Sequence, residues 1–170
     1  MTIKSTTKKA SPAAAAVDAI KLLTDDHKQV HALFQKYKKL VGKDTAGAER
    51  QPLAEQICML LSAHATIEEE IFYPAAREAG VDSDLLDEAE VEHASCKDLI
   101  AQIRDMSPSE DCYDAKLTVL GEYIDHHVKE EQDEIFPKCR KSTMDLNAVG
   151  ASMAARKEVL TAHSAETIEA

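Results

Sequence analysis

The sequence predicts an all-α protein, an up-down-up-down antiparallel four-helix bundle with an additional C-terminal helix. Three observations predict this class. Apolar residues recur at spacings of three and four along four segments, and no segment shows the two-residue alternation of a strand. Gly and Pro each occupy only 5 of 170 positions, so short loops between long helices fit better than the tight turns of a sheet protein. Aromatic residues make up 4% and apolar residues 44%, which indicates an aliphatic core between helices.

The first two helices are predicted from their apolar stripes and from the Gly and Pro residues near their ends. The first helix runs from about Asp18 to Gly42, where glycine favours a stop. The second helix follows Pro52, and its apolar pattern weakens towards Gly80. Pro74 predicts a kink in this helix or an early end to it.

The later helices are bounded in the same way. The third begins near Ser83, a candidate cap, and the Ser-Pro pair at 107–108 ends it. The fourth starts near Ser109 and extends to Pro137. A weaker helix, roughly residues 146–167, closes the chain. We expect it to pack across the bundle or to mediate association, either with a second copy of the chain or with a protein partner.

The chain is expected to have three parts, a flexible N-terminal tail over residues 1–16, the bundle over 17–142, and a C-terminal helix and tail over 143–170. Lysines near the N-terminus faintly imitate a signal peptide. However, Asp18 and Lys21 interrupt any apolar stretch there, so we read this segment as a tail.

Charge and cysteine spacing argue against several classes of partner. The chain has 20 basic and 31 acidic residues and a net charge of −11, which disfavours a nucleic acid or an anionic membrane, because both attract clustered Lys and Arg. No stretch approaches about 18 consecutive apolar residues, so no membrane span is expected. The four cysteines form no Cys-x-x-Cys pair and are typical of reduced thiols in a cytoplasmic protein.

An internal repeat relates the two halves of the predicted bundle. The second and fourth helices each carry a His-x-x-x-Glu pair whose histidine lies ten residues before a proline, and the first and third helices each carry an acidic residue followed by histidine. Each half is therefore one helical hairpin. The repeated residues in chain order are Asp26-His27, His64 with Glu68 and Pro74, Glu92-His93, and His127 with Glu131 and Pro137.

The histidines and glutamates of this repeat lie on helix faces that are otherwise apolar. A lone core histidine or a surface His–Glu pair is an ordinary structural feature, but two such pairs at equal distances from a proline are harder to explain in that way. Buried carboxylates without partners are costly, so two of them among four imidazoles need a compensating positive charge. A pair of metal ions supplies it. The predicted ligands are His27, His64, Glu68, His93, His127 and Glu131.

Imidazole and carboxylate together suit iron, manganese or zinc, and carboxylates on opposed helices can each bridge two ions. Two six-coordinate ions offer about twelve positions, of which two bridging glutamates, a bridging oxo or hydroxo group and four histidines fill about ten. About two positions stay open for O2, another small ligand or a further side chain. Other metal sites fail on spacing, because there is no His-Glu-x-x-His and only Glu90–His93 forms a Glu-x-x-His pair.

Over about residues 25–140 the chain resembles the hemerythrin-like domains, also called HHE cation-binding domains. The resemblance implies a four-helix bundle with a non-haem di-iron centre, two Fe ions with a bridging oxo or hydroxo group. Such a centre reacts with O2, peroxide or nitric oxide, or serves iron and oxygen sensing. The motifs that carry the resemblance are His27, His64-x-x-x-Glu68 with Ile71-Phe72-Tyr73-Pro74, His93, and His127-x-x-x-Glu131 with Ile135-Phe136-Pro137.

The chain departs from the oxygen-carrying members at one position. Those proteins contribute a fifth histidine through a His-x-x-x-His pair on the third helix, whereas Lys97 follows His93 by four residues here. The departure favours a sensing, redox or iron-handling role over reversible O2 carriage. Glu90, three residues before His93, is a candidate extra ligand. His126, on the polar row with Glu130, is expected to be solvated.

These features are compatible with two functions and one structural alternative. The first function is a module that binds or senses O2, nitric oxide or iron at the centre. The second is an oxidoreductase that uses the same centre to act on peroxide or nitric oxide. The structural alternative is a helical bundle in which the histidines and glutamates bind no metal.

Overall fold

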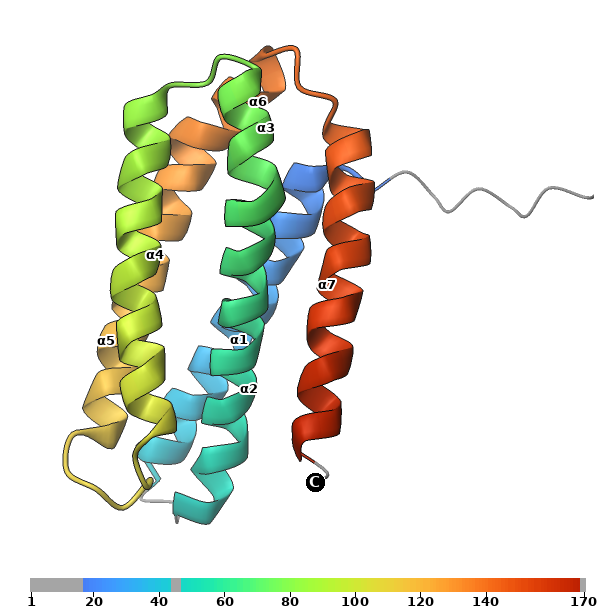
Figure 1. Ribbon diagram of the computed structural model, residues 1–170. Coiled ribbons are helices and arrows are strands. Elements are labelled where there is room, and N and C mark those ends of the chain that lie inside the picture. The colour runs from blue at the N-terminus through green and yellow to red at the C-terminus, as the bar shows by residue number, and fades with distance from the viewer. Residues whose placement is uncertain (1–16, 44–46, 169–170) are drawn as a thin grey trace, which may run out of the picture.

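The computed structural model describes residues 17–43 and 47–168, and every regular element assigned in these ranges is helical. The expected tail over residues 1–16 lies outside the described residues. The elements in these ranges form a bundle of long antiparallel helical rods with one more helix beside it, and Figure 1 shows this arrangement. The predicted fold class, a four-helix bundle with an additional C-terminal helix, is confirmed.

The four rods are α1 (Ala19–Val41), α2 (Gly47–Ile67), α4 (Ser83–Arg104) and α5 (Tyr113–Glu130). In the bundle, α1 packs against α2 and α5, and α4 packs against the same two helices. Each hairpin of the repeat therefore forms one side of the bundle, and the helices of the two hairpins face each other across its interior.

Several helix ends differ from the predicted ones. Helix α2 begins at Gly47 rather than after Pro52, so that Pro52 lies inside the helix, in its second turn, and contributes no backbone N–H there. Helix α5 begins at Tyr113 rather than near Ser109, because successive turns from Ser107 to Tyr113 take up the backbone donors first. The cap of α4 is Asp82, whose carboxylate accepts the backbone N–H of Asp84, and not Ser83.

The two prolines of the repeat neither end their helices nor break the hydrogen-bond ladder. In each rod a π-helical turn precedes the proline, η1 (Glu68–Phe72) in one and η2 (Glu131–Ile135) in the other. The rods then continue as α3 (Tyr73–Glu78) and α6 (Phe136–Lys141). A wide turn shifts bonding by one residue, so a proline without an N–H is tolerated at the start of the next α-helical segment. Each π-turn begins at a predicted glutamate ligand.

The apolar core falls into two clusters separated by a polar layer. One cluster includes Leu23, Ile67 and Phe72, and the other includes Val30 and Leu61. His27 lies between Leu23 and Val30 along α1, and the other predicted histidines occupy the same level of their helices. The layer lies between the two clusters, and its histidines and glutamates are buried.

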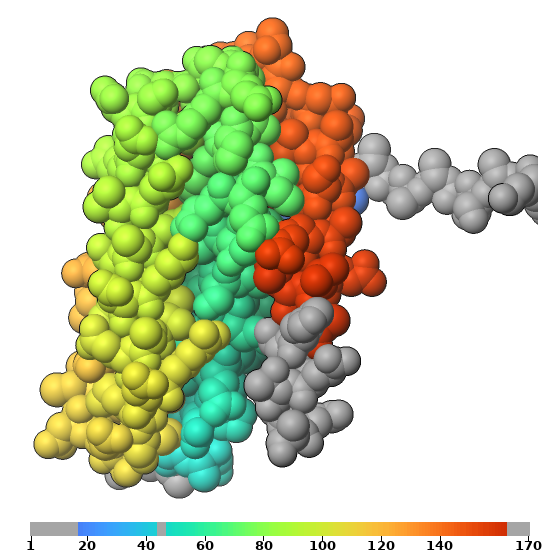
Figure 2. Space-filling view, viewed as in Figure 1, coloured from blue at the N-terminus to red at the C-terminus, as the bar shows by residue number. Residues whose placement is uncertain are grey.

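The C-terminal helix α7 (Leu146–Ile168) lies against α1 and α2, and Figure 2 shows it side by side with α2. Gly150 permits this approach. A Cβ atom at that position would lie 1.8 Å from the carbonyl oxygen of Val17 and 2.7 Å from the backbone nitrogen of Ala19. The expectation that this helix packs across the bundle is confirmed. Within the described part of the chain, no helix has the length and apolar character needed to cross a membrane.

Candidate metal centre

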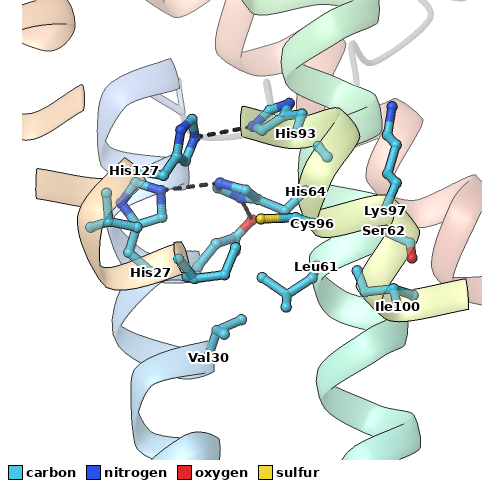
Figure 3. A pocket seen from close by; sticks show the side chains of 14 residues that line it. His27, Val30, Leu61, Ser62, His64, His93, Cys96, Lys97, Ile100 and His127 are labelled. Carbon is cyan, nitrogen blue, oxygen red and sulfur yellow. Dashed lines mark hydrogen bonds and ion pairs between the residues drawn. The ribbon is translucent and has the colours of Figure 1, made fainter. Parts of the chain in front are cut away.

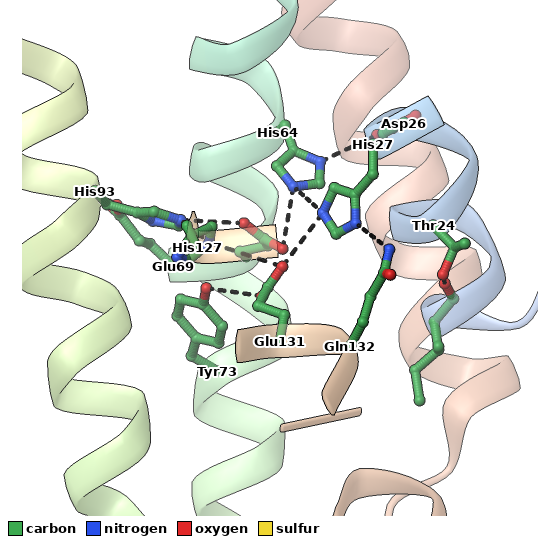
Figure 4. Close-up of polar contacts among 12 residues, drawn as sticks. Thr24, Asp26, His27, His64, Glu69, Tyr73, His93, His127, Glu131 and Gln132 are labelled. Atoms are coloured by element: carbon green, nitrogen blue, oxygen red, sulfur yellow. Dashed lines mark hydrogen bonds and ion pairs between the residues drawn. The ribbon is translucent and has the colours of Figure 1, made fainter. Parts of the chain in front are cut away.

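The six predicted ligands meet in the polar layer. Figure 4 shows the side chains of the four histidines and of Glu131 pointing towards one another. All six are buried, and Glu68 and Glu131 are completely enclosed. These residues are far apart in the chain and come together only through the antiparallel packing of the two hairpins. The set is His27, His64, Glu68, His93, His127 and Glu131.

The first group of donor atoms joins the two histidines of one hairpin to both glutamates. The Nε2 atoms of His27 and His64 are 3.1 Å apart. Oε1 of Glu68 lies 3.2 Å from Nε2 of His64, and Oε2 of Glu131 lies 3.2 Å from Nε2 of His27. Metal–ligand bonds of about 2.1 Å at right angles place neighbouring donors about 3.0 Å apart, so this spacing fits a single cation.

The second group repeats this arrangement in the other hairpin. The Nε2 atoms of His93 and His127 are 3.0 Å apart, and Oε2 of Glu68 lies 3.3 Å from Nε2 of His93. Glu131 is more distant, since its Oε2 is 3.7 Å from Nε2 of His127. Glu68 therefore presents one carboxylate oxygen to each group of donor atoms.

Acceptors outside the centre determine which histidine nitrogen carries the proton. Three of the Nδ1 atoms face a carboxylate oxygen. The distance is 3.4 Å from Nδ1 of His64 to Asp26, 2.9 Å from Nδ1 of His93 to Glu69, and 2.7 Å from Nδ1 of His127 to Glu92. Since a carboxylate only accepts, each Nδ1 is the donor, and the Nε2 of the neutral ring carries a lone pair. This is the tautomer that a metal ligand requires.

His27 has a different outer partner. Its Nδ1 lies 3.5 Å from the side-chain amide nitrogen of Gln132, and turning this amide over presents its oxygen to the Nδ1–H. Gln132 follows Glu131 as Glu69 follows Glu68. The repeat therefore extends to the outer partners, with an amide in place of one carboxylate.

This donor set fits a metal cation and does not fit a hydrogen-bond network of neutral side chains. In the second group, with both rings neutral and protonated at Nδ1, the Nε2 atoms of His93 and His127 present lone pairs to each other and to an oxygen of Glu68. Moreover, both oxygens of Glu68 and Oε2 of Glu131 are buried without a hydrogen-bond donor. Buried lone pairs that converge in this way need a positive charge at their centre.

Without metal, protons have to supply that charge. Burial alone favours the neutral form of His64, but the nearby carboxylate of Glu68, supported by Asp26, raises the pKa of His64 to about 10. Burial acts against ionisation of Glu68 as well, yet the adjacent imidazoles of His64 and His93 hold its pKa well below the ordinary value. The carboxylate therefore stays ionised and the imidazole beside it protonated at neutral pH.

We therefore expect metal binding at pH 7 to release protons into solution. Because the pKa of His64 is raised to about 10, a metal has to displace its proton at any lower pH. Affinity should rise with pH towards 10 and fall on acidification, by about tenfold per pH unit for each proton released. Calorimetric titration in buffers of different ionisation enthalpy measures the released protons. Binding without proton release would contradict this protonation state.

The two halves of the centre differ at the residue that opens the α-helical segment after each π-turn. Tyr73 donates its phenolic O–H to Oε1 of Glu131 at 3.0 Å, whereas the equivalent Phe136 stacks on the ring of His27 with a centroid separation of 5.9 Å. Burial, with the charges of Glu68 and Glu131, holds the pKa of Tyr73 well above its ordinary value of 10.0. The phenol therefore keeps its proton and acts as a donor.

Other polar residues singled out in the sequence lie outside the centre. Glu90 does not reach the centre. An offset of three residues along α4 rotates its side chain away from that of His93 and towards α3, where Glu90 pairs with Arg77 at 3.1 Å. Lys97 pairs with Glu69 at 2.7 Å and so supports the outer partner of His93. Sequence reasoning did not assign the role of Tyr73, although the different aromatic residues at equivalent repeat positions were a visible signal.

Helix α7 reaches the centre through Asp26. One carboxylate oxygen of Asp26 faces His64 and the other accepts a hydrogen bond from the Lys157 ammonium group. Burial favours the neutral acid, but these two donors hold the pKa of Asp26 below its ordinary value. Lys157 thus links the position of α7 to the orientation of a histidine in the centre.

We expect Lys157→Met to lower the free energy of unfolding by about 1–3 kcal/mol, because it removes the ammonium group that bonds one oxygen of the buried Asp26 carboxylate. The matched control is Lys129→Met, whose ion pair with Asp133 is solvent-exposed and whose loss should leave the free energy of unfolding almost unchanged. Urea unfolding measures both. Equal effects of the two substitutions would show that Lys157 contributes no more than a surface charge.

A small void adjoins the imidazoles, and Figure 3 shows His27, His64, His93 and His127 around it. Its volume is about 20 Å³, room for roughly one water-sized molecule. Apart from the histidines its wall is largely apolar, with contributions from Val30, Leu61, Cys96, Ile100, Ile124 and Val128. The void offers space for a small uncharged ligand next to the donor atoms.

The fold and the site together define a helical-bundle protein with a buried histidine and carboxylate site of the metal-binding type. The family model described as the hemerythrin HHE cation-binding domain matches residues 18–139, and the chain belongs to this family. The expected family resemblance is confirmed.

Two known proteins are similar to this chain over most of its length. A protein from Mycobacterium kansasii whose crystal structure is described as a hemerythrin HHE cation-binding domain-containing protein superposes with a TM-score of 0.73 and 23% identity, over 90% of this chain and 93% of that chain. A curated DNA nickase from Nostoc sp. is 29% identical over 117 residues, which are 69% of this chain and 32% of that protein. The chain thus spans about a third of the length of this relative.

Proposed function

We propose that this hemerythrin-like protein holds two iron ions with a bridging oxo or hydroxo group and binds or senses O2, nitric oxide or iron itself. The observation that carries the proposal is the pair of facing Nε2 atoms in each hairpin, joined by the two oxygens of Glu68. Imidazole with carboxylate is a donor set for iron, manganese and zinc rather than for magnesium or calcium.

Each surrounding residue has a physical role in this proposal. The carboxylates of Asp26, Glu69 and Glu92 fix the tautomer of three histidines and increase their basicity. Apolar side chains around the void keep bulk water from the donor atoms. Bound iron supplies open coordination positions and one-electron redox chemistry. Tyr73 provides a proton donor on Glu131, at one side of the centre only.

The test is metal analysis followed by absorption spectroscopy. Protein loaded anaerobically with Fe(II) should contain about two irons per chain by the coordination count. Air oxidation should then produce the ligand-to-metal bands of an oxo-bridged diferric centre, and azide should shift them. Protein that refuses Fe(II), or that binds only zinc with no such bands, would overturn the proposal.

A second candidate is an oxidoreductase that acts on peroxide or nitric oxide at the same centre. The Tyr73 phenol favours it, because a protonated donor next to the centre suits a reaction that consumes protons. The experiment is turnover of peroxide, and separately of nitric oxide with a defined electron source. Many turnovers per centre, slowed in Tyr73→Phe, are expected of an enzyme. Stoichiometric consumption would exclude this candidate.

For partners we propose a small diatomic ligand or peroxide, and neither nucleic acid nor membrane. The net charge of −11 opposes binding to a polyanion, so the DNA nickase activity of the much longer relative is not transferred to this chain. The four cysteines are unpaired in the structure, which supports a cytoplasmic location. Association through α7, with a second copy or another protein, is tested by measuring the mass in solution.

A further inference from the structure

A third set of ligating side chains lies on the surface, next to the buried centre. It consists of Glu92 on α4 and of His126 and Glu130 on α5. Nε2 of His126 lies 3.5 Å from Oε1 of Glu92 and 3.1 Å from Oε1 of Glu130. The imidazole is exposed, as the sequence predicts, but it is held between two carboxylates rather than free in solvent.

The spacing of these atoms suits a single cation. Four- or six-coordinate bonds of about 2.1 Å separate neighbouring donors by roughly 3.0–3.4 Å. His126 and Glu130 are four residues apart on one helix face, so they form a chelate without any change in the backbone. Glu92 closes the set from the opposing helix. Two ionised carboxylates and a neutral imidazole together carry a charge of −2, which a divalent cation balances.

The internal repeat shows what is different at this position. Asp26 and Glu92 are equivalent, and each uses one oxygen to bond the Nδ1 atom of a buried histidine. The second oxygen of Asp26 is neutralised by Lys157, whereas the second oxygen of Glu92 faces only His126. Across residues 17–43 and 47–168, no lysine or arginine lies within ion-pair distance of Glu92 or Glu130. The negative charge here therefore lacks the fixed cation that its counterpart has.

The set is also reachable from solvent. Glu92 and His126 line an open surface hollow of about 340 Å³, together with Ser95 and Tyr123. A partly hydrated ion can be held there by three side chains while water fills its remaining positions. Mixed imidazole and carboxylate donors favour iron, cobalt or zinc over magnesium and calcium, which prefer oxygen alone.

We propose that Glu92, His126 and Glu130 form a surface site for one exchangeable divalent transition-metal ion, separate from the buried centre. The two sites share Glu92, whose other oxygen accepts the Nδ1–H of His127. An ion at the surface site therefore contacts the same carboxylate that orients a histidine of the centre. The surface site depends neither on which metal fills the centre nor on the reaction carried out there.

The test is calorimetric titration of Co²⁺ into protein whose buried centre has already been loaded. One additional equivalent per chain is expected, and His126→Ala and Glu130→Gln should each weaken it at least tenfold. The matched control is His31→Ala. His31 is also exposed and lies 3.4 Å from Asp125, but within residues 17–43 and 47–168 no third ligand joins that pair. Its substitution should leave the additional equivalent unchanged.

Two outcomes would overturn the proposal of a surface site. Either the additional equivalent of Co²⁺ does not bind, or it binds with full affinity to both His126→Ala and Glu130→Gln. A separate variant, His64→Ala, distinguishes this failure from failure of the buried centre. It should lose metal from the centre and retain the surface equivalent. If the buried centre binds no metal, the unmodified protein should still bind one ion at the surface site, and His126→Ala should weaken the binding of that ion.

Discussion

Glu68→Gln is expected to lower the metal affinity of both halves of the centre by at least about 100-fold. This loss exceeds the one expected when an outer hydrogen-bond partner of a metal ligand is removed. The reason is geometric. Its two carboxylate oxygens lie 3.2 Å from Nε2 of His64 and 3.3 Å from Nε2 of His93. The amide has nearly the same shape but no charge and only one acceptor atom, so it cannot serve both positions.

Titration with Fe(II) followed by metal analysis measures the loss. The matched control is Glu134→Gln, which makes the same chemical change at an exposed position of η2 and should retain full metal content. Unchanged helical circular dichroism of metal-free Glu68→Gln would show that the loss is not a folding defect. A variant that keeps one ion at full affinity would contradict the proposal that Glu68 serves both halves of the centre.

Removal of metal is expected to destabilise the whole bundle. A ligand present at 1,000 times its dissociation constant stabilises the folded state by about 4 kcal/mol. For a chain of this size that corresponds to a fall of roughly 8–16 °C in melting temperature on removal. Without metal, Glu68 and Glu131 lie enclosed in the core, where the protonated imidazole of His64 offsets only part of their charge.

Scanning calorimetry of loaded, chelated and reloaded protein provides the measurement. Reloading should restore the original melting temperature, which separates loss of metal from irreversible damage. Glu68→Gln supplies the control, since chelation should change its melting temperature little. Identical melting of loaded and chelated unmodified protein would show that the centre is not coupled to folding.

The sequence by itself determined the features that depend on local spacing. Helical periodicity predicted the bundle, and the His-x-x-x-Glu pairs predicted that His64 and Glu68, like His127 and Glu131, share one face of a helix. These relations hold for any helix, because positions four apart lie one turn above each other. The buried charge then indicated metal, since apolar faces do not otherwise accommodate carboxylates.

Only the tertiary structure decided which side chains meet across helices. Asp26 orients His64 rather than the adjacent His27. Lys157, which follows Asp26 by 131 residues, donates a hydrogen bond to the Asp26 carboxylate, and Glu90 pairs with Arg77. These contacts depend on the rotation and vertical register of packed helices, and both are set by packing of the entire core. The π-turns belong here too, because they begin at Glu68 and Glu131 and let each rod continue past its proline.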